Sequence, residues 1–155
     1  MDALTQDAAA GPATRRIDDL LAHYGESHRN PVNERIHFVA IPLIMLSLLG
    51  LLAAVHPWLA YTFVGASMLY YVRLSSPVFL LAMAIVSAAA LAAVHAMGSW
   101  VFPISAAIFV AAWIAQFVGH KIEGKKPSFF EDLQYLWVGP LFVLSKLMGK
   151  LGVRW

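Results

Sequence analysis

Long apolar stretches separated by short polar breaks make up most of the chain. Segments 38–55, 77–97 and 100–119 contain no Asp, Glu, Lys or Arg. A helix needs about 20 residues to cross the hydrocarbon core of a bilayer. Each segment reaches that length, the first with the help of the turns before it, which begin at Asn30 and Pro31, an N-cap followed by a proline at the first helical position. The pattern therefore predicts at least three membrane-spanning helices.

A fourth apolar segment, residues 58–72, is shorter. At the rise of an α-helix it covers about 22 Å, less than the roughly 30 Å of a bilayer core. Trp58 begins it and Arg73 follows it. Trp anchors helices at the membrane interface, and the long Arg side chain reaches the headgroups. We therefore predict that this segment also spans, giving four transmembrane helices.

The distribution of positive charge tests this count. Lys and Arg occur before the first span, after the second and after the fourth, and the other two turns contain none. The full set is Arg15, Arg16, Arg29, Arg35, Arg73, Lys121, Lys125, Lys126, Lys146, Lys150 and Arg154. Cytoplasmic loops of membrane proteins carry an excess of these residues. Four spans with both termini in the cytoplasm place every positive charge on that side.

Two further helices are expected outside the spans. Residues 17–24 are apolar at helical spacing and charged on the opposite face, which indicates a short amphipathic helix on the membrane surface. Ser128 and Glu131 form a capping box that begins a last helix, broken near residues 139–140. A fifth span would carry the terminal positive charges outside, so we predict an interfacial or re-entrant helix.

Composition agrees with this fold class. Hydrophobic residues make up 60% of the chain and charged residues 13%, against about 25% charged in soluble domains. We expect an all-α, integral membrane helical bundle with one domain over residues 14–155 and a disordered tail over residues 1–13. The net charge of +2 is too small to indicate nucleic-acid binding. The length of 155 residues leaves no room for a second domain.

The predicted topology divides the six histidines. His56 and His95 lie at the outer ends of spans, whereas His23, His28, His37 and His120 lie at the cytoplasmic boundary. Polar residues accompany two of the latter at helical spacing. Asn33 lies four residues before His37, and Gln116, His120 and Glu123 follow at i, i+4 and i+7. Each set therefore projects from one helix face.

These polar sets indicate a metal site. Ionisable groups at the edge of a span are costly and usually functional. The chain has no cysteine, so a metal would take His nitrogen or carboxylate oxygen, which suits Fe(II), Mn(II) or Zn(II). We predict that His28, His37, His120 and Glu123 bind it, and that the amides of Asn33 and Gln116 orient the imidazoles. Headgroup contacts would explain a single histidine equally well, and Glu123 could instead pair with neighbouring lysines.

Two motifs on these residues resemble a known family. The first is His28-x-Asn30-Pro31-x-Asn33-x-x-Ile36-His37, followed by Pro42, and the second runs from Gln116 through Gly119-His120-x-x-Glu123 to Pro127. Together with Gly139-Pro140 they resemble the 2-hydroxy fatty acid dioxygenase family over roughly residues 20 to 150. The two motifs together are quite specific.

The resemblance implies an Fe(II)-dependent membrane enzyme of fatty acid α-oxidation. A 2-hydroxy long-chain fatty acid would react with O2 and lose its carboxyl carbon, giving an acid one carbon shorter. His28, His37 and His120 match the family's histidines, while His23 lies beside the motif. The hydroxyl and carboxylate of the substrate can chelate iron, and Arg73 could pair with the carboxylate. We expect a bacterial inner membrane, or the endoplasmic reticulum if the source is eukaryotic.

Two alternatives remain open at this stage. One is a different metal-dependent membrane lipid oxygenase or hydroxylase, which only product analysis distinguishes. The other is a non-enzymatic membrane protein, either a scaffold or a small transporter. A transporter should carry polar groups along the middle of its bundle, whereas segments 38–55 and 77–94 contain only isolated serines. A scaffold should tolerate loss of His37 or His120 without a change in metal content. The sequence leaves the oligomeric state, the substrate chain length and the physiological pathway undetermined.

Overall fold

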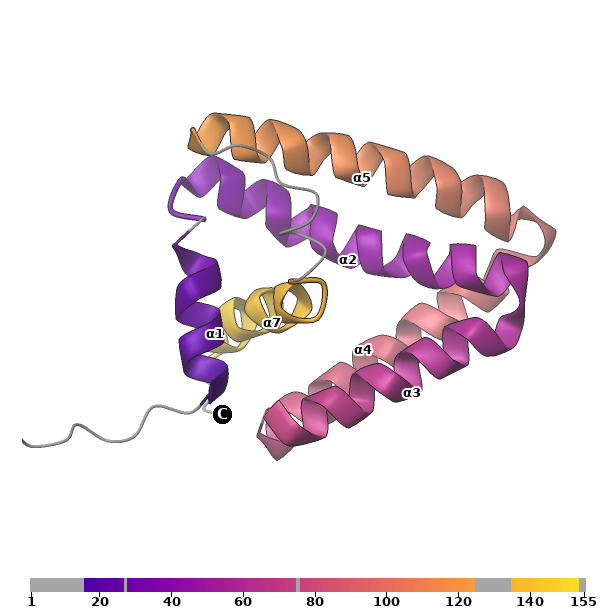
Figure 1. Ribbon diagram of the computed structural model, residues 1–155, viewed down its shortest axis with the longest axis horizontal. Helices are drawn as coiled ribbons and strands as arrows, with labels where there is room; N and C mark the ends of the chain where they lie inside the picture. Colours follow the sequence, from indigo (N-terminus) through magenta and orange to yellow (C-terminus); the bar gives the residue numbers. More distant parts are fainter. Residues whose placement is uncertain (1–15, 27, 75, 125–134, 154–155) are drawn as a thin grey trace, which may run out of the picture.

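The computed structural model describes residues 16–26, 28–74, 76–124 and 135–153, and every regular element in these ranges is helical (Figure 1). The elements are α1 (Arg16–Gly25), α2 (Pro31–Val55), α3 (Pro57–Leu74), α4 (Pro77–Ala96), the short 3-10 helix η1 (Gly98–Trp100), α5 (Val101–Glu123) and α7 (Val138–Lys150). The all-α prediction is confirmed for this part of the chain. The predicted tail at 1–13 and the capping box at Ser128 and Glu131 lie outside the described residues.

Local sequence sets the helix ends. Asn30 caps α2, because its side chain accepts a hydrogen bond from the Val32 amide at 2.9 Å and Pro31 opens the first turn. Ser76 and Pro77 begin α4 in the same way. Gly124 ends α5 at a φ of 76°, a conformation that favours glycine. The predicted start of the first span at Asn30 and Pro31 is confirmed.

The long helices form two pairs. Figure 1 shows α2 beside α5 and α3 beside α4, joined at one end and diverging towards the other. Glycines allow α2 and α5 to approach closely at both ends. A side chain at Gly50 would collide with Ser105, and one at Gly119 would collide with Asn33. The close approach at Gly119 brings the start of α2 against the end of α5.

Helices α1 and α7 occupy the end where the two pairs diverge (Figure 1). Their shared core contains Tyr71 of α3 and Phe142 of α7, both buried. Polar contacts fix α7 in this position. The Tyr71 hydroxyl donates to the Trp137 carbonyl at 3.0 Å, and the Trp137 indole donates to the Ser67 hydroxyl at 2.9 Å. Lys146 of α7 forms a 3.1 Å ion pair with Glu34 of α2. α7 begins beside the break predicted at residues 139–140.

Among the residues that the structure describes, three helices are long and apolar enough to cross a membrane: Pro31–Val55, Pro77–Ala96 and Gly98–Glu123. Large apolar side chains on their outer faces are exposed, among them Val39, Leu81 and Ile114. Exposed apolar surface of this extent is typical of an interaction surface, and together with the length of these helices it suggests a membrane protein. The fourth predicted span corresponds to α3, which is helical but is not one of these three. The four-span topology therefore stays a prediction.

Candidate metal centre

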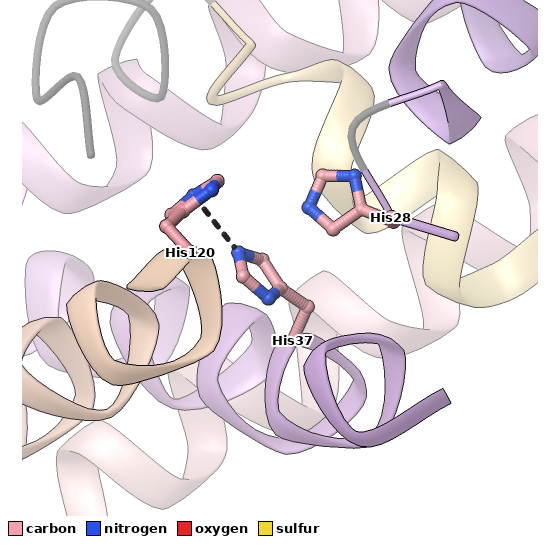
Figure 2. Close-up of side chains that lie close together, drawn as sticks. All are labelled: His28, His37 and His120. Carbon is pink, nitrogen blue, oxygen red and sulfur yellow. Dashed lines mark hydrogen bonds between the residues drawn. The ribbon is translucent and has the colours of Figure 1, made fainter. Parts of the chain in front are cut away.

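Three buried histidines meet at the diverging end of the bundle. His37 comes from the second turn of α2, His120 from the last turn of α5, and His28 from the segment between α1 and α2 (Figure 2). Their exposed fractions are 0%, 6% and 5%. Each offers one ring nitrogen, and these nitrogens lie within 4.8 Å of one another. The predicted convergence of these three residues is thus present in the structure.

Backbone carbonyls select the tautomer of two of the rings. His28 Nδ1 lies 2.8 Å from the Tyr24 carbonyl oxygen, and His37 Nδ1 lies 3.0 Å from the Asn33 carbonyl oxygen. A carbonyl can only accept, so each Nδ1 carries the proton and donates it. In the neutral ring the lone pair is then on Nε2. A metal-binding histidine usually donates its other ring N–H to a carbonyl or carboxylate oxygen in this way.

The rings are packed at steep angles to one another. His37 and His120 have an interplanar angle of 83°, with 3.3 Å between their Nε2 atoms (Figure 2). The ring centroids of His28 and His37 are 4.3 Å apart, and the interplanar angle is 75°. The Tyr24 ring stacks on the His28 ring, with 4.3 Å between their centroids. The centroid of the Phe142 ring lies 5.6 Å from that of His28. Aromatic packing therefore holds the imidazoles in place and covers them.

The donor set fits a divalent transition metal. His28 and His37 each donate their Nδ1 proton to a carbonyl oxygen, which leaves the Nε2 lone pair available to a metal. Neutral imidazole binds Fe(II), Zn(II), Cu(II) and Ni(II) well, and the absence of thiolates disfavours Cu(I). Three protein nitrogens leave further coordination positions for substrate, as catalytic sites require.

Glu123 makes a different set of contacts from the one predicted. Its carboxylate accepts hydrogen bonds from the backbone amides of Arg29 and Asn30, at 3.0 and 2.9 Å, and from the Asn33 side-chain amide at 3.0 Å. It is not one of the residues in the histidine group. The end of α5 is therefore fastened to the start of α2, and the contact with Arg29 fixes the residue directly after His28.

Replacing Glu123 by glutamine is expected to weaken metal binding by about 10- to 100-fold without removing the site, the usual effect of losing a group that positions the ligands without binding the metal. Glutamine keeps the size but presents an NH2 group to backbone donors. Competition with a chromophoric chelator measures the metal dissociation constant. Glu26→Gln is the matched control, because Glu26 is exposed and lies outside the site. Complete loss of metal in Glu123→Gln would instead favour a direct ligand.

The other predicted site residues are distributed as follows. Asn33 is fully buried and contributes its carbonyl to His37, while its side-chain amide donates to Glu123. Gln116 is buried one turn before His120, and no hydrogen bond from it to a histidine is found in the described part of the chain. Arg73 is exposed at the end of α3, which lies apart from the start of α2 in Figure 1. The structure therefore gives Arg73 no contact with the histidines.

Sequence reasoning did not identify Tyr24, Phe142 and Gly119 as parts of the site. Tyr24 precedes His28 by four residues, but such spacing by itself indicates only a shared helix face. Gly119 lies inside the second motif, beside His120. Its close packing on Asn33 can be recognised only once α2 is known to pair with α5. Phe142 comes from a distant segment, and no local pattern connects it to the histidines.

Comparisons with known proteins bear on this site. A family model described as 2-hydroxy-palmitic acid dioxygenase Mpo1-like matches residues 14–151. The 2-hydroxy-palmitic acid dioxygenase MPO1 of Saccharomyces cerevisiae is 30% identical over 138 residues, which covers 85% of this chain and 79% of the yeast protein. No solved structure matches the chain. The matched range includes all three histidines.

Proposed function

The chain belongs to the 2-hydroxy-palmitic acid dioxygenase Mpo1-like family, and we propose that it is an Fe(II)-dependent enzyme that shortens 2-hydroxy fatty acids by one carbon. The convergence of His28, His37 and His120 from three separate elements is the observation that carries the proposal. Helix bundles commonly build metal sites from inward-facing side chains in this way. A scaffold would have no reason to bury three imidazoles together at the edge of a membrane.

His28, His37 and His120 would hold the iron. Bound there, Fe(II) supplies a Lewis acid for the hydroxyl and carboxylate oxygens of the substrate and the one-electron chemistry that O2 requires. The Tyr24 and Asn33 carbonyls keep the Nδ1 protons in place, so that two Nε2 lone pairs face the site. Tyr24 and Phe142 cover His28 and exclude water from it.

The overall reaction needs no separate reductant. Converting a 2-hydroxy acid to carbon dioxide and an acid one carbon shorter releases four electrons, and O2 accepts four on reduction. One O2 per substrate molecule therefore balances the reaction, with one molecule of water as the remaining product. The protein has only to position the two reactants.

We also propose that the chain crosses the membrane four times with both termini cytoplasmic. Contacts of Glu123 with Asn30 place the end of α5 beside the start of α2, so these two helices cross in opposite directions. The chain then enters α3 and leaves α4 on the same side. If α4 spans, α3 must span as well, in the return direction. Its 18 residues cover about 27 Å, close to the thickness of a bilayer core.

Product analysis tests the proposed function. Purified protein loaded with Fe(II) is expected to convert 2-hydroxypalmitate and O2 to the saturated acid one carbon shorter, detected by mass spectrometry. Palmitate should give no product under the same conditions, because it has no 2-hydroxyl group to chelate iron together with the carboxylate and no hydroxylated carbon to be oxidised. Formation of a hydroxylated lipid of unchanged length would show a different oxygenase. Absence of any oxidised product would contradict the proposal.

A further inference from the structure

A small cavity of about 20 Å³ lies beside the histidine group, and its position follows from helix geometry. Three of its wall residues are Tyr24, Ile41 and Gln116. Each is four residues from one histidine of the site: Tyr24 precedes His28, Ile41 follows His37, and Gln116 precedes His120. For His37 on α2 and His120 on α5 this separation is one helical turn, about 5.4 Å along the axis, whereas His28 follows the end of α1. The cavity is therefore one turn deeper in the bundle than the metal-binding nitrogens.

Gln116 is the polar side chain whose position in this wall needs an explanation. It is 4% exposed, and none of the described residues forms a hydrogen bond with its amide. Gln116 lines the cavity, and its amide is not among the polar atoms that are both fully buried and without a partner, so the amide is open to water or a ligand in the cavity. The amide offers one acceptor oxygen and two N–H donors. A ligand with a hydroxyl group or a carboxylate would provide the missing partner.

The size and lining of the cavity indicate what enters it. A cavity of about 20 Å³ has room for one water molecule or one hydroxyl group. Beyond Gln116 the walls become largely apolar, with Ile44, Met45 and Trp113 deeper along α2 and α5. Because the space they enclose fits only one such group, the hydroxyl would enter the cavity and the acyl chain would lie outside it.

We propose that Gln116 recognises the 2-hydroxyl group of the substrate: its amide carbonyl accepts a hydrogen bond from the hydroxyl, and its N–H group donates one to the adjacent carboxylate. The inference rests on the proposed function, because it takes a 2-hydroxy acid as the ligand. Gln116 then determines specificity for hydroxylated over plain fatty acids. This differs from the role expected from sequence, in which the amide would orient an imidazole.

Ligand binding in the absence of O2 tests the proposal. Dissociation constants for 2-hydroxypalmitate and palmitate are measured on Fe(II)-loaded wild type, Gln116→Met and Ile114→Met. The first variant keeps the length of the side chain and removes its hydrogen bonds. Ile114→Met is the matched control, because Ile114 is 58% exposed on the same helix. The iron contributes to binding in all three proteins, so a difference in the preference between the two ligands reports on Gln116.

Wild type and Ile114→Met are expected to prefer 2-hydroxypalmitate, and Gln116→Met is expected to lose about tenfold or more of that preference with unchanged iron content. An unchanged preference would overturn the proposal and leave water as the cavity's occupant. Loss of iron in Gln116→Met would also overturn it, since the amide would then support the histidines. Should Gln116→Met not fold, Gly139→Ala is a second variant.

Gly139→Ala narrows the cavity from the opposite wall, because the added methyl would contact Ile41 at 3.4 Å and the Tyr24 hydroxyl at 3.5 Å. It is expected to reduce the preference for the hydroxylated ligand, and an unchanged preference would contradict the subsite. The reaction itself is tested separately by product analysis. A wild type that makes no shortened acid, but whose ligand preference depends on Gln116, would refute the reaction and retain the subsite.

Discussion

Replacement of His37 by alanine is expected to abolish activity and to weaken iron binding by more than a hundredfold. Loss of a group that only hydrogen-bonds a metal ligand typically costs about 10–100-fold in metal affinity. His37 is proposed as a direct ligand, so its loss should cost more. It is the central member of the group: its ring lies 4.3 Å from that of His28 and 4.8 Å from that of His120. Removing it leaves the ring nitrogens of His28 and His120 without the histidine that lies next to both. Iron content after gel filtration and product formation are the two measurements.

His56→Ala is the control for this experiment. His56 is exposed at the opposite end of α2, so its loss should leave iron content and turnover unchanged. His37→Gln provides a second variant that nearly preserves the volume of the buried side chain and limits the effect of a cavity on stability. A His37→Ala protein that retains one iron per chain and full turnover would show that the three histidines are not the metal site.

Gly119→Ala is expected to have the second-largest effect although it removes no functional group. The added methyl would collide with the Asn33 side chain and would lie 3.3 Å from Cε1 of His37. Neither neighbour can move freely, because Asn33 is fully buried and its amide is held by Glu123. The start of α2 must therefore shift away from α5, which separates His37 from His120. We expect loss of most iron binding and activity, with a stability loss of about 1–3 kcal/mol from overpacking.

Gly65→Ala is the matched control. Gly65 is also a helical glycine, on α3, but a side chain there would meet no atom within 4 Å. It should retain iron and activity, and it should be at least as stable as wild type because alanine favours the helix. Thermal unfolding and iron content are compared for both variants. A fully active Gly119→Ala protein would contradict the claim that close approach of α2 and α5 shapes the site.

The helical architecture could be predicted from sequence to a large extent. Uncharged segments of sufficient length gave three of the long helices, and Asn30 with Pro31 gave the start of α2. The segment that became α3 was harder, because Arg73 and several polar or aromatic residues lower its hydropathy. How α1 and α7 pack where the helix pairs diverge could not be predicted. Such packing depends on contacts between distant segments, for example Tyr71 with the Trp137 carbonyl.

For the site, sequence identified the three histidines but not the roles of their polar neighbours. Helical spacing placed Gln116, His120 and Glu123 on one face of α5, and the structure retains that face. Helical spacing could not show that Glu123 accepts hydrogen bonds from the backbone amides of Arg29 and Asn30 instead of joining the histidines. That contact depends on the register between α2 and α5. Arg73 was proposed from its charge alone, without information on its distance from the site.

Titration of metal-free protein with Fe(II) tests the central claim, one catalytic iron held by His28, His37 and His120, most directly. Aliquots of anaerobic Fe(II) are added to purified protein, and the shortened acid formed from 2-hydroxypalmitate and O2 is measured at each step. Product formation is predicted to rise in proportion to iron and to stop rising at one iron per chain. Activity that is present without iron, or that does not respond to it, would contradict the account.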